Sequence, residues 1–119
     1  MKYICPLIVV SDIQRSRNFY ENVLNQTVSE DYGENLVFEG GFSIHLEAHY
    51  KGLIMQKPIN KGGNNVELFF ISDALDELQE RLKGLGVEWI HEIRTEPWGQ
   101  RVLRFYDPDA YIIEVGEPI

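Results

Sequence analysis

The chain repeats one order of local patterns, and this repetition constrains its fold more than any other feature of the sequence. Each half opens with a short apolar run typical of a buried strand, and continues with a Ser-Asp pair suited to cap a helix. An amphipathic helix and three more strand-like runs follow in both halves. Asp12 and Asp73, the second residues of the two pairs, stand about half the chain apart. Because one such unit cannot close a core over its own sheet, we expect two units in one fold.

Alternation and helical spacing give the bounds of the predicted elements. In the first unit they are a strand over 3–10, a helix over 13–24, and strands over 27–31, 36–39 and 42–48. In the second unit they are a strand over 66–71, a helix over 75–85 ended by Gly86, and strands over 87–93, 101–106 and 111–115. We therefore expect a single domain, 1–119, with unit one over about 1–49, a polar connection over 50–65, and unit two over about 66–119.

Composition excludes several classes of function. The 119 residues hold 11 Lys and Arg against 19 Asp and Glu, a formal net charge of −8, so we expect neither nucleic acid nor a membrane as partner. Cys5 is the only cysteine, which rules out an intrachain disulfide and a cysteine-rich zinc module. The apolar run over 4–10 is far shorter than the roughly 20 residues of a membrane span, and no cleavage motif follows it. We expect a cytoplasmic protein.

Two stretches of sequence carry a family resemblance. The first is VVSDIQRSRNFY at 9–20; the second is PWGQR at 97–101, continued by DPD at 107–109 and IEV at 113–115. In this order, over a duplicated pattern, they resemble the vicinal oxygen chelate superfamily of glyoxalases, bleomycin-resistance proteins and extradiol dioxygenases. The resemblance spans nearly the whole chain. It implies an α+β fold in which duplicated βαβββ units form an eight-stranded, cup-shaped mixed sheet with flanking helices.

The resemblance also implies four metal-ligand positions inside the cup. Carried over to this chain, they are Cys5 and Glu67 on the first strand of each unit, and His45 and Glu114 on the last. Glyoxalases usually carry His or Gln where Cys5 stands and Glu where His45 stands, and many carry His where Glu67 stands. The two-His-one-carboxylate iron site of the extradiol enzymes is therefore not reproduced, so a dioxygenase ranks low.

The residues themselves give partial support to a metal. Glu67 and Glu114 interrupt apolar strands, and an unpaired buried charge costs several kcal/mol, so both need partners. A divalent cation is one candidate, with Zn²⁺, Ni²⁺, Mn²⁺ or Fe²⁺ suited to this mixture of carboxylate, imidazole and thiolate. The alternatives are a small core residue for Cys5, a hydrogen-bonded cleft residue for His45, and a solvated face for Glu67.

Four further residues are expected to line a substrate pocket: His91, Trp98, Arg101 and Phe69. His91 fits a cleft or a packed position, and the alternative for Trp98 is a lid over the core. Arg101 and Arg104 face opposite sides of one strand, so at most one reaches a ligand. Ala110 follows the DPD turn where the family usually has Gly, and a left-handed conformation there would carry strain.

Three functions fit these patterns. The first is a metal-dependent lyase or isomerase acting on a small oxygenated molecule, with Glu114 and Glu67 as the catalytic residues and Glu114 as the general base. The second is a metal-free protein of the bleomycin-resistance kind that sequesters a cationic aromatic drug. The third is a catalytically inactive ligand-binding or regulatory module. The first ranks just above the second because all four ligand positions hold ionisable groups. The resemblance also implies a small-molecule ligand and a homodimer.

Overall fold

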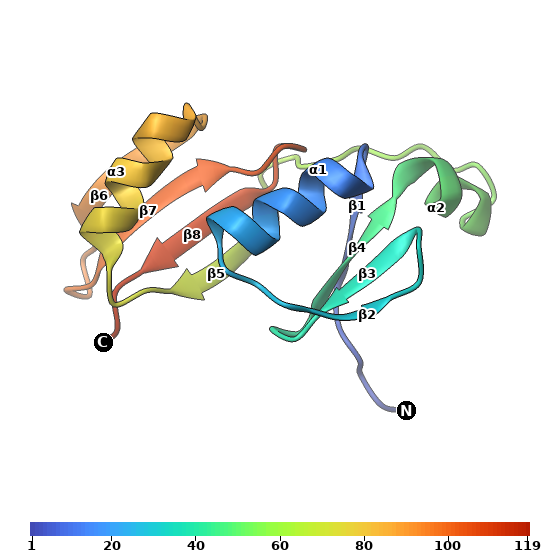
Figure 1. Cartoon of the computed structure of the whole chain (residues 1–119), viewed down its shortest axis with the longest axis horizontal. Helices are drawn as coiled ribbons and strands as arrows, with labels where there is room; N and C mark the ends of the chain where they lie inside the picture. The colour runs from blue at the N-terminus through green and yellow to red at the C-terminus, as the bar shows by residue number, and fades with distance from the viewer. The chain divides into compact units, whose positions relative to one another are not determined.

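The first unit builds a four-stranded sheet around one crossover helix. Its elements are β1 (Leu7–Val10), α1 (Ile13–Asn18) with the π-helical turn η1 (Phe19–Val23), β2 (Val28–Asp31), β3 (Asn35–Phe38) and β4 (Phe42–Leu46). The strand order is β1-β4-β3-β2, with β1 parallel to β4 and the other pairs antiparallel. The long connection that a parallel pair needs is supplied by α1 and the two strands that follow it (Figure 1).

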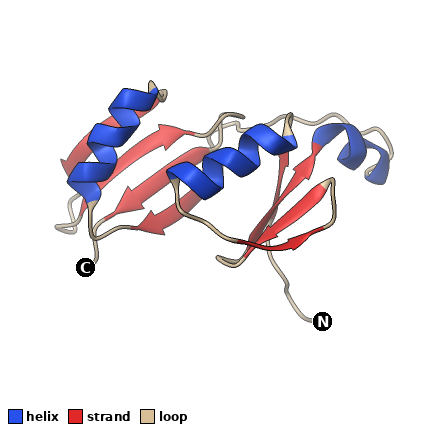
Figure 2. Ribbon diagram, in the orientation of Figure 1, coloured by secondary structure: helices blue, strands red, loops and turns tan.

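The second unit repeats this topology. Its elements are β5 (Glu67–Ile71), α3 (Leu75–Leu85), β6 (Trp89–Thr95), β7 (Arg101–Tyr106) and β8 (Ile112–Gly116). The order β5-β8-β7-β6, with β5 parallel to β8, matches that of the first unit strand for strand (Figure 2). The α+β class, the duplicated βαβββ units and the eight strands are therefore confirmed, the strands forming two sheets of four.

The computed structural model describes residues 1–119, which divide into the units Met1–Lys61 and Gly62–Ile119. The division falls inside the predicted connection. The strand predicted over 42–48 is too long, because β4 ends at Leu46 and the helix α2 (Glu47–Leu53) begins there. Glu47 and Ala48 favour helix over strand, and α2 lies against β1 and β4. None of the helices has the length and apolar character that crossing a membrane requires.

Aromatic packing forms the core of the first unit. Tyr20 from η1 is fully buried against two sheet residues, with its ring centroid 5.3 Å from Phe42 and 5.7 Å from Phe38. The Phe38 and Phe42 rings stack at 4.7 Å. Such pairs add about 0.5–1.5 kcal/mol each to the free energy gained from burial. One face of the first sheet is thereby covered by its crossover helix.

Leucines hold the helix of the second unit to its sheet. Leu75, Leu78 and Leu82 are buried, and the helix ends at Gly86, whose left-handed φ of 68° confirms the predicted stop. The buried sheet residues Leu103, Phe105, Ile113 and Val115 share one face by strand alternation. The opposite face carries Arg104 of β7 and Glu114 of β8.

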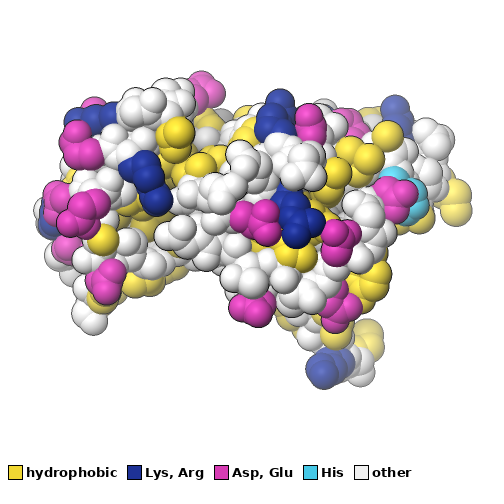
Figure 3. Space-filling model, viewed as in Figure 1, with side chains coloured by type: hydrophobic (Ala, Val, Ile, Leu, Met, Phe, Trp, Pro, Cys, Tyr) yellow, Lys and Arg dark blue, Asp and Glu magenta, His cyan; other side chains and the backbone are white.

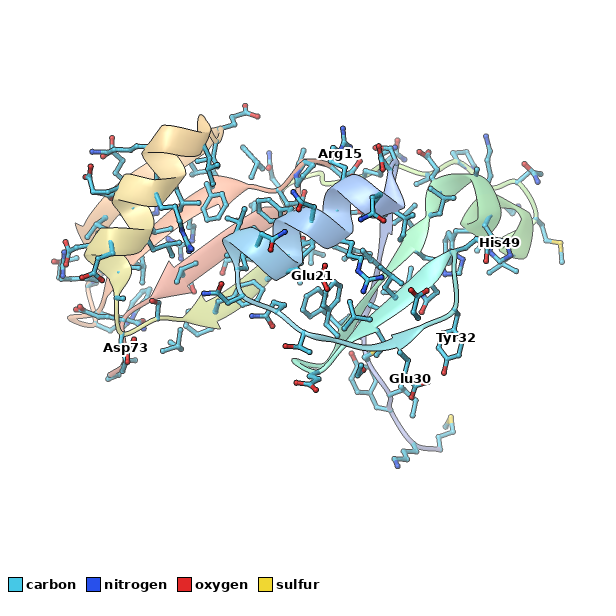
Figure 4. The ribbon with its side chains drawn as sticks, in the orientation of Figure 1. Arg15, Glu21, Glu30, Tyr32, His49 and Asp73 are labelled. Carbon is cyan, nitrogen blue, oxygen red and sulfur yellow. The ribbon has the colours of Figure 1, made fainter.

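Only one of the two predicted caps forms as expected. Asp12 precedes α1 and its Oδ1 accepts a hydrogen bond from the backbone N–H of Arg15 at 3.0 Å. In the second unit Ala74 is the residue before α3, and Ser72 Oγ accepts from its backbone N–H at 3.1 Å. Asp73, labelled at the start of α3 in Figure 4, makes no side-chain cap because one residue separates it from the helix.

The DPD turn is strained where the sequence lacks glycine. Ala110 has φ of 66°, the left-handed conformation in which a Cβ is unfavourable. Asp107 holds the turn, because its Oδ1 accepts from the backbone N–H groups of Asp109 at 2.8 Å and Tyr111 at 2.9 Å. A side chain at Gly62 would collide with the Ala110 carbonyl oxygen. The buried Asp107 thus stabilises a conformation that Ala110 itself disfavours.

Replacing Ala110 with glycine should stabilise the protein. Ala110 is exposed, so Ala110→Gly removes the strain without loss of packing, and we expect about 0.5–1 kcal/mol more free energy of unfolding by urea denaturation. Ala48→Gly is the matched control, because exposed Ala48 lies in the helix α2. Glycine there should lower the free energy of unfolding by a similar amount. Equal effects of the two substitutions would contradict this account.

Candidate functional site

The candidate site lies on the face of the second sheet that α3 does not cover. Arg104 on β7 pairs with Glu114 on β8, which pairs in turn with Phe69 on β5. His91 on β6 is the partner of Arg104 on the other side. Glu67 shares the face because it lies two residues before Phe69 on the same strand. Four strands therefore contribute neighbouring side chains to one surface.

Arg104 is the centre of this group. Its Nε–H donates to Glu67 Oε1 at 2.8 Å, one terminal N–H donates to His91 Nε2 at 3.0 Å, and the other donates to Glu114 Oε1. His91 can accept because its Nδ1–H donates to the backbone carbonyl of Glu92 at 2.8 Å, which leaves the Nε2 lone pair free. One guanidinium group thus binds two carboxylates and an imidazole.

A third carboxylate leaves the group with excess negative charge. Glu96 is buried and accepts a hydrogen bond from Arg94 Nε at 2.6 Å, and its Oε1 lies 3.9 Å from Arg104. Glu67, Glu96 and Glu114 therefore oppose two guanidinium groups. The local balance is one negative charge in excess, in a partly buried region.

Burial raises the pKa of the Glu114 carboxyl above its ordinary value. The charge of Arg104 opposes this rise, whereas the charges of Glu67 and Glu96 add to it. Glu114 is therefore held as a carboxylate mainly by one partner.

The second unit does not present Glu67 and Glu114 as free metal ligands. Both accept hydrogen bonds from Arg104, so a divalent cation between them would have to displace a guanidinium group or lie beside a like charge. In keeping with this, no three His, Cys, Asp or Glu side chains within either unit are arranged to hold a metal ion. The residues of this unit, as they are placed, do not fit the metal that the family resemblance implies.

The first unit does not bring its two predicted ligands together either. His45 on β4 pairs with Val9 on β1, whereas Cys5 lies four residues before Val9. That spacing is about 13 Å along a strand. A thiolate and an imidazole on one metal need Cβ atoms within roughly 10 Å, given bonds of about 2.0–2.3 Å to the metal. Cys5 also lies outside β1, because that strand begins at Leu7 and not at residue 3 as predicted. Cys5 and His45 are therefore not neighbours across the sheet.

His45 instead belongs to a chain of hydrogen bonds. Asn35 Nδ2–H donates to His45 Nδ1 at 3.0 Å, and His45 Nε2–H donates to His49 Nδ1 at 2.8 Å, with the two rings stacked at 5.0 Å. His49 lies on α2, where Figure 4 labels it. The sequence signal for this pair is the spacing of four residues, which a strand followed at once by a helix turns into contact. His45 is therefore a hydrogen-bonded buried residue.

The predicted pocket residues separate into two groups. His91 and Phe69 lie beside Arg104 and the two glutamates, whereas Arg101 pairs with Asp76 of α3 at 2.8 Å on the other face. Arg104 is thus the arginine of the candidate site, and Arg101 lies on the opposite face of the same strand. Trp98, in the turn after β6, is 58% exposed, and its Nε1–H donates to Gln100 Oε1 at 2.8 Å. It forms no lid over the core.

Protonation of His45 should destabilise the protein. Burial lowers the pKa of His45, and the charge of His49 lowers it further, while Glu34 opposes them. The unfolded chain therefore binds the proton first, and the free energy of unfolding should fall as the pH drops below about 6.5. ¹⁵N NMR should find the Nε2–H tautomer, and urea denaturation should find this pH dependence reduced in His45→Gln. A dominant Nδ1–H tautomer would contradict the assigned hydrogen bonds.

Ionised Glu114 should cost stability at neutral pH. Because its folded pKa is raised, the folded state binds the proton more readily, so this carboxyl favours folding below its unfolded pKa of about 4.3 and the benefit is lost as the pH rises through the folded pKa. A ¹³C NMR titration should place the Glu114 pKa above the ordinary range, and higher still in Arg104→Gln. A Glu114 pKa at or below the ordinary range, or one unchanged by Arg104→Gln, would contradict this balance.

Comparisons with known proteins agree with the fold and with the motifs. A family model described as a glyoxalase-like domain matches residues 3–119. A protein of unknown function from Agrobacterium tumefaciens is 37% identical, with a TM-score of 0.89 over 100% of this chain and 95% of that one. A glyoxalase/bleomycin resistance protein/dioxygenase superfamily member from Sphaerobacter thermophilus is 25% identical, with a TM-score of 0.67 over 99% and 98%.

A more distant structure shares the fold. A glyoxalase-related enzyme from Fulvimarina pelagi is 18% identical, with a TM-score of 0.81 over 99% of this chain and 89% of that one. The family model spans almost every residue, and both units have the expected strand order. The chain therefore belongs to the glyoxalase-like domain family of the vicinal oxygen chelate superfamily.

Proposed function

We propose that this protein is a metal-free binding member of its family, and that it takes a cationic aromatic small molecule on the Arg104 face of the second sheet. The observation that carries the proposal is that Arg104 already neutralises the two glutamates expected to hold a metal. This reverses the order of the first two functions that the sequence favours. The ionisable groups at those positions have a partner within the unit, so they no longer require a metal.

The excess negative charge around Arg104 is better evidence for a cationic ligand than the net charge of the whole chain. Figure 3 shows acidic side chains scattered across the visible face of the molecule, with Lys and Arg between them, so the net charge of −8 is spread out. The carboxylates around Arg104 retain one excess negative charge in a partly buried setting. A monovalent cation beside them would complete the neutralisation without displacing the guanidinium group.

An exposed aromatic ring adjoins this charge. Phe69 is 53% exposed and lies directly across from Glu114, and Ile71 extends the same apolar surface along β5. A cation held over an aromatic face gains about 0.5–2 kcal/mol, and a planar ligand would also stack on the ring. Phe69 and the glutamates thus supply the two contacts that a planar cation needs.

A second candidate is a lyase or isomerase in which Glu114 moves a proton. The observation that favours it is the raised pKa of Glu114, since a general base works best when its pKa lies near the working pH. In this candidate Arg104 would hold the carboxyl in place. The homodimer, the small-molecule ligand and the cytoplasmic location stay predictions from the sequence.

Fluorescence titration tests the binding proposal. Bleomycin and the planar cation ethidium should each change the tryptophan emission saturably, and raising the salt concentration should weaken binding because the attraction is electrostatic. Phe69→Ala should weaken binding roughly tenfold, equivalent to about 1.4 kcal/mol. Leu85→Ala is the matched control, because Leu85 is similarly exposed at the end of α3.

Two results would reject the proposal. One is the absence of saturable binding with both probes, which would favour the inactive module. The other is equal binding by the Phe69→Ala and Leu85→Ala proteins, which would place the ligand away from β5.

A further inference from the structure

We infer that Arg104 is a built-in cation at a Glu-His-Glu set, and that its removal would turn the second unit into a binding site for a divalent metal. The inference goes beyond the proposed function, because it concerns a cation site formed by Glu67, His91 and Glu114 whatever ligand the protein takes. The metal class is the borderline group of Zn²⁺, Ni²⁺ and Mn²⁺, which mixed carboxylate and imidazole ligands suit.

Hydrogen bonding defines the set. The three N–H directions of the guanidinium group point to Glu67 Oε1, His91 Nε2 and Glu114 Oε1. Each of these acceptors is an atom type that binds divalent metals. The imidazole tautomer also suits a metal, because Nδ1–H donates to the Glu92 carbonyl and keeps the Nε2 lone pair directed at Arg104. The arginine therefore occupies the point on which three ligand atoms converge.

Charge explains why removing Arg104 would create a demand for another cation. The side chains of Glu114 and Glu96 are 9% and 8% exposed, and that of Arg104 is 17% exposed. Without the guanidinium group, Glu114 would keep a buried charge beside two other carboxylates and only Arg94 to oppose them. Removing one partner from a buried ion pair is strongly unfavourable, and a divalent cation would relieve it.

The set must contract to hold a metal. Its atoms surround a guanidinium group at hydrogen-bond distances, whereas metal–ligand bonds are about 2.0–2.2 Å, which is why these residues do not form a metal cluster in the present structure. Glu67 is the member that can move, because its side chain is 37% exposed at the start of β5. A methionine at position 104 would fill the space of the arginine stem without a charge or a donor.

The matched control is on the same strand. Arg101 also pairs with two carboxylates, those of Asp76 and Glu117, but its partners include no imidazole and lie on the opposite face. Arg101→Met therefore removes the same charge from a pair of acidic groups without exposing a three-ligand set. Arg104→Met/Glu114→Gln removes a ligand from the set that Arg104→Met exposes.

The test is metal binding by the full chain. Each protein is stripped with chelator, titrated calorimetrically with Zn²⁺, Ni²⁺ or Mn²⁺ alone, and assayed for retained metal after dialysis. We expect no stoichiometric binding by the natural protein or by Arg101→Met, one metal per chain for Arg104→Met, and at least a tenfold loss of affinity in Arg104→Met/Glu114→Gln. If Arg104→Met unfolds, refolding on addition of excess Zn²⁺, followed by circular dichroism, is the expected result.

Three results would overturn the inference. The first is one metal bound by the natural protein and lost in Glu67→Gln or Glu114→Gln, because the carboxylates would then bind metal with Arg104 present. The second is no binding by folded Arg104→Met, or no recovery of its fold with metal. The third is an equal gain in metal affinity by the Arg104→Met and Arg101→Met proteins. The drug titration does not depend on these results, so the two proposals can fail separately.

Discussion

Parallel pairing between the first and last strand of each unit determines where the side chains of its sheet point. In the second unit this pairing sets Glu114 opposite Phe69 and two residue pairs along the strands from Glu67. Antiparallel pairing of β7 with β8 then brings Arg104 beside Glu114. Alternation places the apolar residues of the same strands under α3. A shift of one residue in either register would bury Arg104 among the leucines and expose the core.

Arg104 allows a carboxylate to lie buried within the otherwise apolar strand β8. Burial disfavours the charge of Glu114, and the guanidinium group compensates for it by charge and by a hydrogen bond. A buried ion pair of this kind adds little net stability but is costly to break, so its value lies in keeping one arrangement of side chains. It also gives the site a fixed positive charge that cannot be lost by deprotonation.

Sequence patterns predicted the duplicated units and the eight strands, because alternation, leucine spacing and turn residues are local signals. They also marked Ala110 as a position where a left-handed conformation would carry strain, and the structure shows that conformation. They missed α2, since Phe42 to Ala48 alternates like one long strand and only the structure shows that it ends at Leu46. Strand alternation placed Arg101 and Arg104 on opposite faces but could not tell which face α3 covers. The partner of Glu114 could therefore not be predicted, because the residues of a single strand do not determine its register with the neighbouring strand.

The central claim is that a guanidinium group, and not a metal, neutralises Glu67 and Glu114. A crystal structure of the natural protein grown with excess Zn²⁺, with data collected at the zinc absorption edge, tests it most directly. The account predicts Arg104 within hydrogen-bond distance of both carboxylates, with no anomalous peak between them. A strong peak bonded to Glu67 and Glu114, with Arg104 displaced, would contradict it.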